Sequence, residues 1–131
     1  MDELPIASGD DVVRVRQQVR TAASATGLSL VDQTKLVTAA SELARNALVH
    51  GGGGIAQVEV ITSANGRPGV RVTFADTGPG IADLEQALTD GWTTGGGLGL
   101  GLSGARRLVD EFELTSEPGA GTRVVVSKWR R

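Results

Sequence analysis

Apolar residues recur along this chain at two different spacings, and each spacing predicts a type of secondary structure. Within residues 10–25 and 31–49 they follow one another at steps of three or four residues, the spacing of one face of an α-helix. Asp10 or Asp11 is expected to cap the first helix, and Gly27 is expected to end it. The predicted buried faces consist of Val12, Val15, Val19, Ala22 and Ala23 in the first helix and of Leu36, Ala40, Leu43 and Ala47 in the second.

Runs rich in valine and isoleucine, bounded by glycine and proline, predict strands. The predicted strands are residues 3–8, 56–63, 70–76, 112–116 and 122–129. Pro5 lacks a backbone N–H, which places the first strand at an edge of the sheet. A third helix is expected over residues 102–111 and a short one over residues 84–89. Because helices and strands are segregated and consecutive strands form hairpins, we expect an α/β two-layer sandwich, with residues 1–131 as a single domain.

Charge and composition narrow the classes of partner. The net charge of −2 and the pI near 5.3 argue against nucleic acid or an acidic membrane surface as the main partner. The absence of cysteine from the sequence excludes disulfides and thiolate chemistry. No apolar stretch has the length and flanking charge of a signal peptide or a membrane span, so we expect a cytoplasmic protein.

Residues 95–104 contain six glycines, a density that is costly for an ordered segment. Each glycine loses roughly 0.5–1 kcal/mol relative to alanine, so the close approach of a ligand such as a polyphosphate is indicated. A P-loop is excluded because its lysine is missing, and Gly99-Leu-Gly101-Leu-Ser-Gly104 lacks the preceding strand of a dinucleotide site. A protein-kinase glycine loop requires a larger domain. A plain flexible loop leaves the alternating leucines unexplained, which favours a phosphate-binding loop at the start of the third helix.

A row of polar residues lies along one side of the second predicted helix. Glu42, Asn46 and His50 lie at four-residue steps and share one side of the helix with Lys35. A solvated polar face is the ordinary interpretation, but the rest of this helix is rich in apolar residues, and an asparagine is costly to bury unpaired. An amide oxygen one turn from a carboxylate suits a largely hydrated Mg²⁺ ion, and the carboxylate can take a proton from an attacking hydroxyl.

Asp76 follows an apolar strand and begins the segment Asp76-Thr-Gly78-Pro-Gly80. Such a segment is often only a turn that ends a strand. The functional interpretation places the Asp76 carboxylate where it accepts a hydrogen bond from the amino group of adenine, while Gly78 and Gly80 let a flat ring approach. Thr122, at the start of the last strand, can present a hydroxyl to the base or to a water beside Asp76.

In their order and spacing these segments resemble the nucleotide-binding motifs of the GHKL ATPase superfamily, which takes in gyrase, Hsp90, histidine kinases and MutL. The resemblance implies a Bergerat-type fold with a mixed, mostly antiparallel sheet, covered on one face by about three helices. It implies ATP and Mg²⁺ as cofactors, with Glu42 as catalytic base, Asn46 as Mg²⁺ ligand and Asp76 as the adenine-binding residue. The further nucleotide-binding residues implied are Gly78, Gly80, Gly95, Gly97, Leu98, Gly99, Leu100, Gly101, Leu102 and Thr122.

Residues 10–129 are similar more specifically to the stand-alone serine/threonine kinases of bacterial partner-switching systems, the switch kinases of the RsbT type. The resemblance rests on the run from Leu28 to Asn46 and on the ending Gly-Thr-Arg-Val-Val-Val-Ser-Lys-Trp. Such kinases phosphorylate STAS-domain scaffold or antagonist proteins in stress signalling and then activate an output protein such as a PP2C-type phosphatase. A histidine kinase is not expected, because the single histidine, His50, lies on the nucleotide-binding helix itself. Two alternatives stay open: an anti-sigma factor kinase that binds a sigma factor, and a nucleotide-binding regulator without catalysis.

Overall fold

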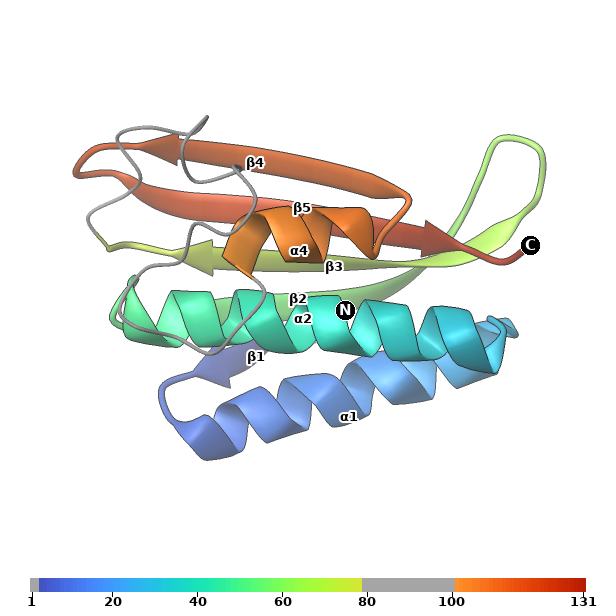
Figure 1. The fold of residues 1–131 in the computed structure, drawn as a ribbon, viewed down its shortest axis with the longest axis horizontal. Coiled ribbons are helices and arrows are strands. Elements are labelled where there is room, and N and C mark those ends of the chain that lie inside the picture. The colour runs from blue at the N-terminus through green and yellow to red at the C-terminus, as the bar shows by residue number, and fades with distance from the viewer. Residues whose placement is uncertain (1–2, 79–100) are drawn as a thin grey trace.

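The computed structural model describes residues 3–78 and 101–131, which form two layers (Figure 1). One layer is a five-stranded sheet in the order β1-β2-β3-β5-β4, in which every neighbouring pair is antiparallel. The other layer consists of helices that pack on one face of this sheet. The elements are β1 Glu3–Ile6, α1 Gly9–Thr26, α2 Leu30–Val49, β2 Gly54–Thr62, β3 Pro68–Asp76, α4 Gly101–Arg107, β4 Glu111–Glu117 and β5 Gly121–Trp129. The predicted sandwich is confirmed, while the short helix predicted over residues 84–89 lies outside the described residues.

The start of α1 differs from the prediction. Ser8 is the N-cap residue, and both Asp10 and Asp11 lie inside the first turn, so the predicted capping role of these two residues is wrong. The Asp11 Oδ2 atom accepts a hydrogen bond of 2.8 Å from the backbone N–H of Ala7 and so satisfies a donor just before the helix. Gly27 ends the helix as predicted, with a φ of +82° that glycine adopts without strain.

The core lies between the sheet and the helices, and the register of the strands explains its composition. One row of side chains across the sheet consists of Val58, Val72, Val126 and Phe112. The next row consists of Ala56, Phe74, Val124 and Leu114. Because successive side chains of a strand point to opposite faces, both rows point toward the helices. The predicted apolar positions of α1 and α2 meet them and are buried, except Ala22, which is partly buried.

Helix α4 is shorter than predicted, because the chain turns into the sheet early. The helix ends at Arg107, and residue 111 already belongs to β4. The backbone N–H of Leu108 donates to Ala105 in a tight last turn, and that of Asp110 donates to the carbonyl of Ser127 in β5. Pairing with a strand distant in sequence therefore overrides the local helical pattern.

A buried ionic cluster joins the end of β5 to the helical layer. The Lys128 side chain is 5% exposed, and its Nζ lies 3.6 Å from Asp32 Oδ1 and 3.4 Å from Asp110 Oδ1. Arg131 contacts the same two carboxylates from the more exposed side. Asp32 lies in the first turn of α2, so the cluster fixes this helix end against the last strand.

Candidate functional site

Asp76 is the last residue of β3, and the backbone around it approaches closely at glycines. A Cβ atom on Gly51 would lie 2.4 Å from Cγ of Asp76, and one on Gly121 would lie 2.2 Å from its backbone oxygen. Atoms that are not bonded do not come so close, so the approach requires glycine at both positions. The Gly78 N–H donates a hydrogen bond of 2.9 Å to Asp76 Oδ1, which holds the carboxylate in place.

Gly51, which directly follows the C-cap residue His50, brings the end of α2 to Asp76. The backbone N–H groups of His50 and Gly51 both donate to the carbonyl of Asn46, at 2.9 and 3.3 Å. A Cβ on Gly78 would lie 2.6 Å from Cα of Gly51, so the turn after β3 packs directly on the turn after α2. The structure therefore brings together two predicted site segments, those of Asn46 and Asp76, that are distant in the sequence.

Glu42 lies one turn before Asn46 on α2, and its side chain is 12% exposed. Four residues correspond to a rise of about 6 Å along a helix, so both side chains lie near one another on the same side. His50 is also half-buried, whereas Lys35, which was predicted to share this side, is exposed. The predicted row of polar residues is thus half-buried toward the end of α2 that meets Asp76.

Arg45 pairs with the predicted base Glu42, a contact that the sequence had not indicated. Its Nη1 lies 3.5 Å from Oε1 of Glu42. The signal that was available is the three-residue spacing, which allows an ion pair along a helix. The arginine side chain is 51% exposed, so it covers the glutamate from the solvent side.

Thr122 lies directly opposite Asp76 in the pairing of β3 with β5. Its hydroxyl is 2.9 Å from that of Ser116, which also donates to the carbonyl of Gly121 at 3.0 Å. Ser116, which no sequence pattern indicated, therefore orients the Thr122 hydroxyl beside the end of β3 at Asp76. The cross-strand position of Ser116 becomes evident only once the hairpin register is known.

The glycine-rich segment is described only at its end. Gly101 has a φ of +70° and begins α4, and the Leu102 side chain is 6% exposed in the core. Leu102 therefore anchors this end of the segment in the core. The other predicted nucleotide-binding residues lie outside the described residues: Gly80, Gly95, Gly97, Leu98, Gly99 and Leu100.

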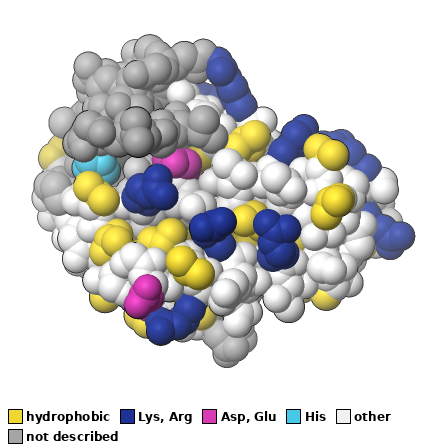
Figure 2. All heavy atoms as spheres, turned by 60° about the horizontal axis from the view of Figure 1, so that its bottom comes forward, with side chains coloured by type: hydrophobic (Ala, Val, Ile, Leu, Met, Phe, Trp, Pro, Cys, Tyr) yellow, Lys and Arg dark blue, Asp and Glu magenta, His cyan; other side chains and the backbone are white. Residues whose placement is uncertain are grey.

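The two faces of the sandwich differ in charge. Figure 2 shows lysine and arginine side chains spread over the helical side, with few acidic side chains among them. The exposed basic residues of α1 and α2 are Arg14, Arg16, Arg20, Lys35 and Arg45. On the opposite face, exposed glutamates alternate with core residues along β4. In the described part of the chain, no group of three or more His, Asp or Glu side chains is arranged to hold a metal ion.

Residues 31–131 match the family described as histidine kinase-, DNA gyrase B- and HSP90-like ATPases. The chain belongs to this GHKL ATPase family. The match begins in the first turn of α2 and includes all the predicted site residues. The predicted family is thus confirmed, and the glycines at Asp76 are required for the close packing of the turns around it.

Two curated relatives have similar sequences. The chain is 43% identical over 121 residues to a serine/threonine-protein kinase RsbT of Bacillus subtilis, covering 92% of this chain and 90% of the relative. It is 35% identical over 101 residues to an anti-sigma F factor of Halalkalibacterium halodurans, covering 74% of this chain and 69% of the relative.

Solved structures support the fold. The structure of the RsbU and RsbW domains of Rv1364c from Mycobacterium tuberculosis matches all of this GHKL chain with a TM-score of 0.64 at 23% identity, over 33% of that chain. The catalytic domain of histidine kinase ThkA matches with a TM-score of 0.53 at 16% identity, over 97% of that chain. None of the described helices is long and apolar enough to cross a bilayer.

Proposed function

We propose that this GHKL ATPase is a protein serine/threonine kinase of a bacterial partner-switching pathway, which uses Mg-ATP to phosphorylate a STAS-domain scaffold or antagonist protein. The observation that supports the enzyme class best is the presence of Glu42, largely buried, one turn from Asn46 at the end of α2 that meets Asp76. Binding of adenine and Mg²⁺ does not require a carboxylate at this position, whereas transfer of a phosphoryl group to a hydroxyl requires a base. The class agrees with the name of the Bacillus relative.

Each residue has a defined role in this proposal. Asp76 accepts the hydrogen bond of the adenine amino group, and the Asn46 amide oxygen would hold a Mg²⁺ ion, which would offset the negative charge of the phosphates. Glu42 takes the proton of the acceptor serine or threonine hydroxyl as its oxygen attacks the γ-phosphorus. The bond between the γ-phosphorus and the β–γ bridging oxygen breaks, and ADP leaves with the electron pair. The cytoplasmic location and the activation of a PP2C-type phosphatase or other output protein after release belong to the same proposal.

The proposal is tested with radiolabelled ATP, Mg²⁺ and purified STAS-domain proteins encoded beside this chain. We expect label on serine or threonine of one of them. Glu42→Ala is expected to retain ATP binding and to lower transfer by at least about 100-fold, while Asn46→Ala loses Mg²⁺-dependent ATP binding. Glu113→Ala is the matched control, because this glutamate is exposed on the opposite face of the sheet. Undiminished transfer by Glu42→Ala would contradict its role as a base.

The alternative is an anti-sigma factor kinase, which the similarity to an anti-sigma F factor favours. Pull-down of a purified sigma factor, but not of a STAS-domain protein, would support it. ATP binding without transfer to any of these proteins would instead indicate a regulator without catalysis.

A further inference from the structure

Strand β1 covers only half of the edge of β2. The four residues of β1 pair with residues Gly54 to Gln57, whereas β3 pairs with the whole length of β2 on its other side. Among the described residues, Val58 to Thr62 therefore have a neighbouring strand on one side only. Such an edge presents backbone N–H and C=O groups that can pair with another extended chain.

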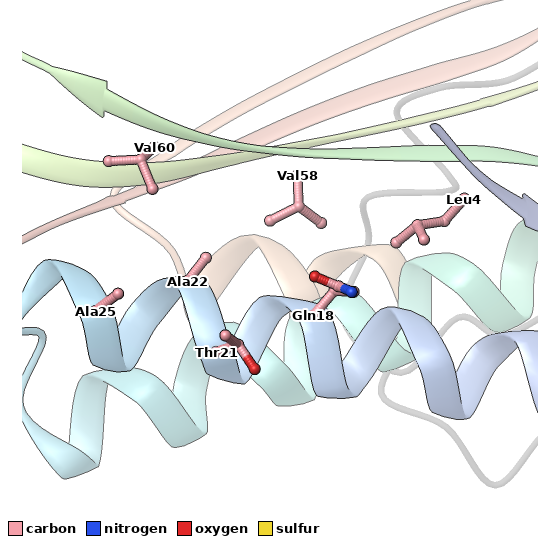
Figure 3. A pocket seen from close by; sticks show the side chains of 7 residues that line it. All are labelled: Leu4, Gln18, Thr21, Ala22, Ala25, Val58 and Val60. Atoms are coloured by element: carbon pink, nitrogen blue, oxygen red, sulfur yellow. The ribbon is translucent and has the colours of Figure 1, made fainter. Parts of the chain in front are cut away.

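A groove lined mainly by apolar side chains, with Gln18 and Thr21 of α1 as its polar members, runs beside this edge (Figure 3). It has a volume of about 260 Å³ and lies between β2 and α1, with Leu4 of β1 at one end. The residues that matter for its shape are Val58 and Val60 on the strand and Thr21, Ala22 and Ala25 on the helix. The side chain of Val60 is directed toward this groove although the residue is 60% exposed, since the small helix residues opposite leave room above it. The groove and the unpaired edge are thus continuous with each other.

The other face of the same edge is acidic. Glu59 points away from the groove, because side chains alternate along a strand, and Glu3 of β1 also lies exposed on that face. The Glu59 side chain is 30% exposed and lies 4.0 Å from Arg71, which covers it from the β3 side only. On the open side of Glu59, an added strand would place its own side chains next to this carboxylate.

We propose that the edge of β2 from Val58 to Thr62 docks an extended segment of a partner protein, which adds to the sheet antiparallel to β2, in line with β1. Apolar side chains at alternate positions of that segment enter the groove beside Val60, and a lysine or arginine between them faces Glu59. A second copy of this chain fits less well. If two copies paired about Val60, each Glu59 would face Ile61 of the other copy rather than a basic group.

The docking site is separate from the nucleotide site. Gly54 pairs with Asp76 at one end of β2, and Val60 is six residues further along, a distance of roughly 20 Å. A partner held at this edge therefore leaves Asp76 and Asn46 accessible. A strand can dock at this edge without ATP and without phosphoryl transfer, so docking is independent of the proposed kinase activity.

The probe is a capped peptide of alternating lysine and valine, titrated into the full-length, nitrogen-15-labelled protein without nucleotide. We expect saturable amide shifts confined to β2 from Val58 to Thr62 and to α1 near Ala22 and Ala25. A nitroxide on the peptide amino terminus should broaden the Thr62 end, as the antiparallel direction requires. Methylation of the backbone nitrogens that face β2 should weaken binding about tenfold, because it removes the edge hydrogen bonds.

Two variants test the surface itself. Val60→Lys is expected to weaken binding of the lysine–valine peptide about tenfold, while Val13→Lys, at an exposed valine outside the groove, leaves it unchanged. Glu59→Lys is expected to reverse the preference toward a glutamate–valine peptide. A Val60→Lys spectrum matching that of the parent protein shows that the fold is kept.

Several results would overturn the inference. Docking is contradicted if the amide shifts do not saturate, if they are centred on other residues, or if the N-methylated peptide binds equally well. A concentration-dependent dimer that Val60→Lys abolishes would instead assign the edge to a second copy of this chain. Phosphate transfer assayed in the same preparation reports separately on the kinase proposal.

Discussion

At the scale of single residues, the site around Asp76 depends as much on missing side chains as on functional groups. Gly51 and Gly121 place backbone where any Cβ would overlap with Asp76, and Gly78 fixes Oδ1 through its N–H. One carboxylate is thereby held at the end of β3, with backbone rather than side chains around it. Rigid placement of one polar group in this way is what the recognition of a base edge requires.

Asp76→Asn tests the assignment of the adenine contact. The amide keeps the shape of the side chain but replaces one acceptor oxygen with a donor, which opposes the amino group of adenine. We expect ATP affinity to fall by about 10- to 100-fold, measured by isothermal titration calorimetry, with an unchanged denaturation midpoint. Unchanged affinity would remove Asp76 from the adenine site.

Gly51→Ala tests the close approach of the turn after α2. The added methyl group would meet Asp76 Cγ at 2.4 Å and the carbonyl oxygen of Ala47 at 2.7 Å, so either the turn or the carboxylate must shift. We expect a loss of about 1–3 kcal/mol in the free energy of unfolding and at least a tenfold loss of ATP affinity. Gly9→Ala is the matched control, because nothing lies within 4 Å of its added methyl group. Equal behaviour of the two variants in urea denaturation would contradict this account.

At the scale of elements, α2 combines a packing face with a functional face. Its buried side is built largely from small residues, namely Ala39, Ala40, Ala44 and Ala47 with Leu36 and Leu43. Small side chains let α2 lie close to both α1 and the sheet, so that the polar residues near its end reach the end of β3. The capped start at Ser29, which accepts from the N–H of Asp32 at 3.1 Å, fixes the phase of the helix.

Ala40→Leu tests this close packing. Ala40 is fully buried, so three extra carbon atoms have to displace neighbouring side chains or the helix itself. We expect a loss of about 1–3 kcal/mol in the free energy of unfolding, with weaker ATP binding as α2 shifts. Thr38→Leu, at an exposed position of the same helix, should stay within about 0.5 kcal/mol of the parent protein. Both values come from urea denaturation followed by circular dichroism.

At the scale of the whole molecule, a sheet with one covered face gives the protein two different surfaces. The helical side presents basic residues, and residues Val58 to Thr62 of β2 lie at the opposite end of that strand from its pairing with Asp76. The buried cluster of Lys128 with Asp32 and Asp110 joins these parts, since it connects β5, the start of α2 and the segment before β4. The position of the start of α2 relative to the sheet thus depends on this cluster.

Lys128→Met tests this connection. Removing the ammonium group leaves two poorly exposed carboxylates beside one another, with the outer Arg131 as their remaining cationic partner among the described residues and the Trp129 N–H donating to Asp110. We expect the free energy of unfolding to fall by about 3 kcal/mol, measured by chemical denaturation. Lys35→Met removes an exposed lysine from α2 and should change stability by less than about 0.5 kcal/mol. A Lys128→Met protein as stable as the parent would show that the cluster only balances its desolvation cost.

The sequence by itself determined what depends on local periodicity and on residue chemistry. The buried faces of α1 and α2, the strand pattern and the candidate roles of Glu42, Asn46 and Asp76 follow from spacing and side-chain type, because a helix or strand repeats its geometry every few residues. Only the tertiary structure decided how far each element extends and which segments meet. Helix α4 ends early because Asp110 pairs with Ser127, the close approach at Asp76 needs Gly51 and Gly121, and within the described residues β1 pairs only with Gly54 to Gln57 of β2. These features arise from contacts between segments distant along the chain, which no local pattern records.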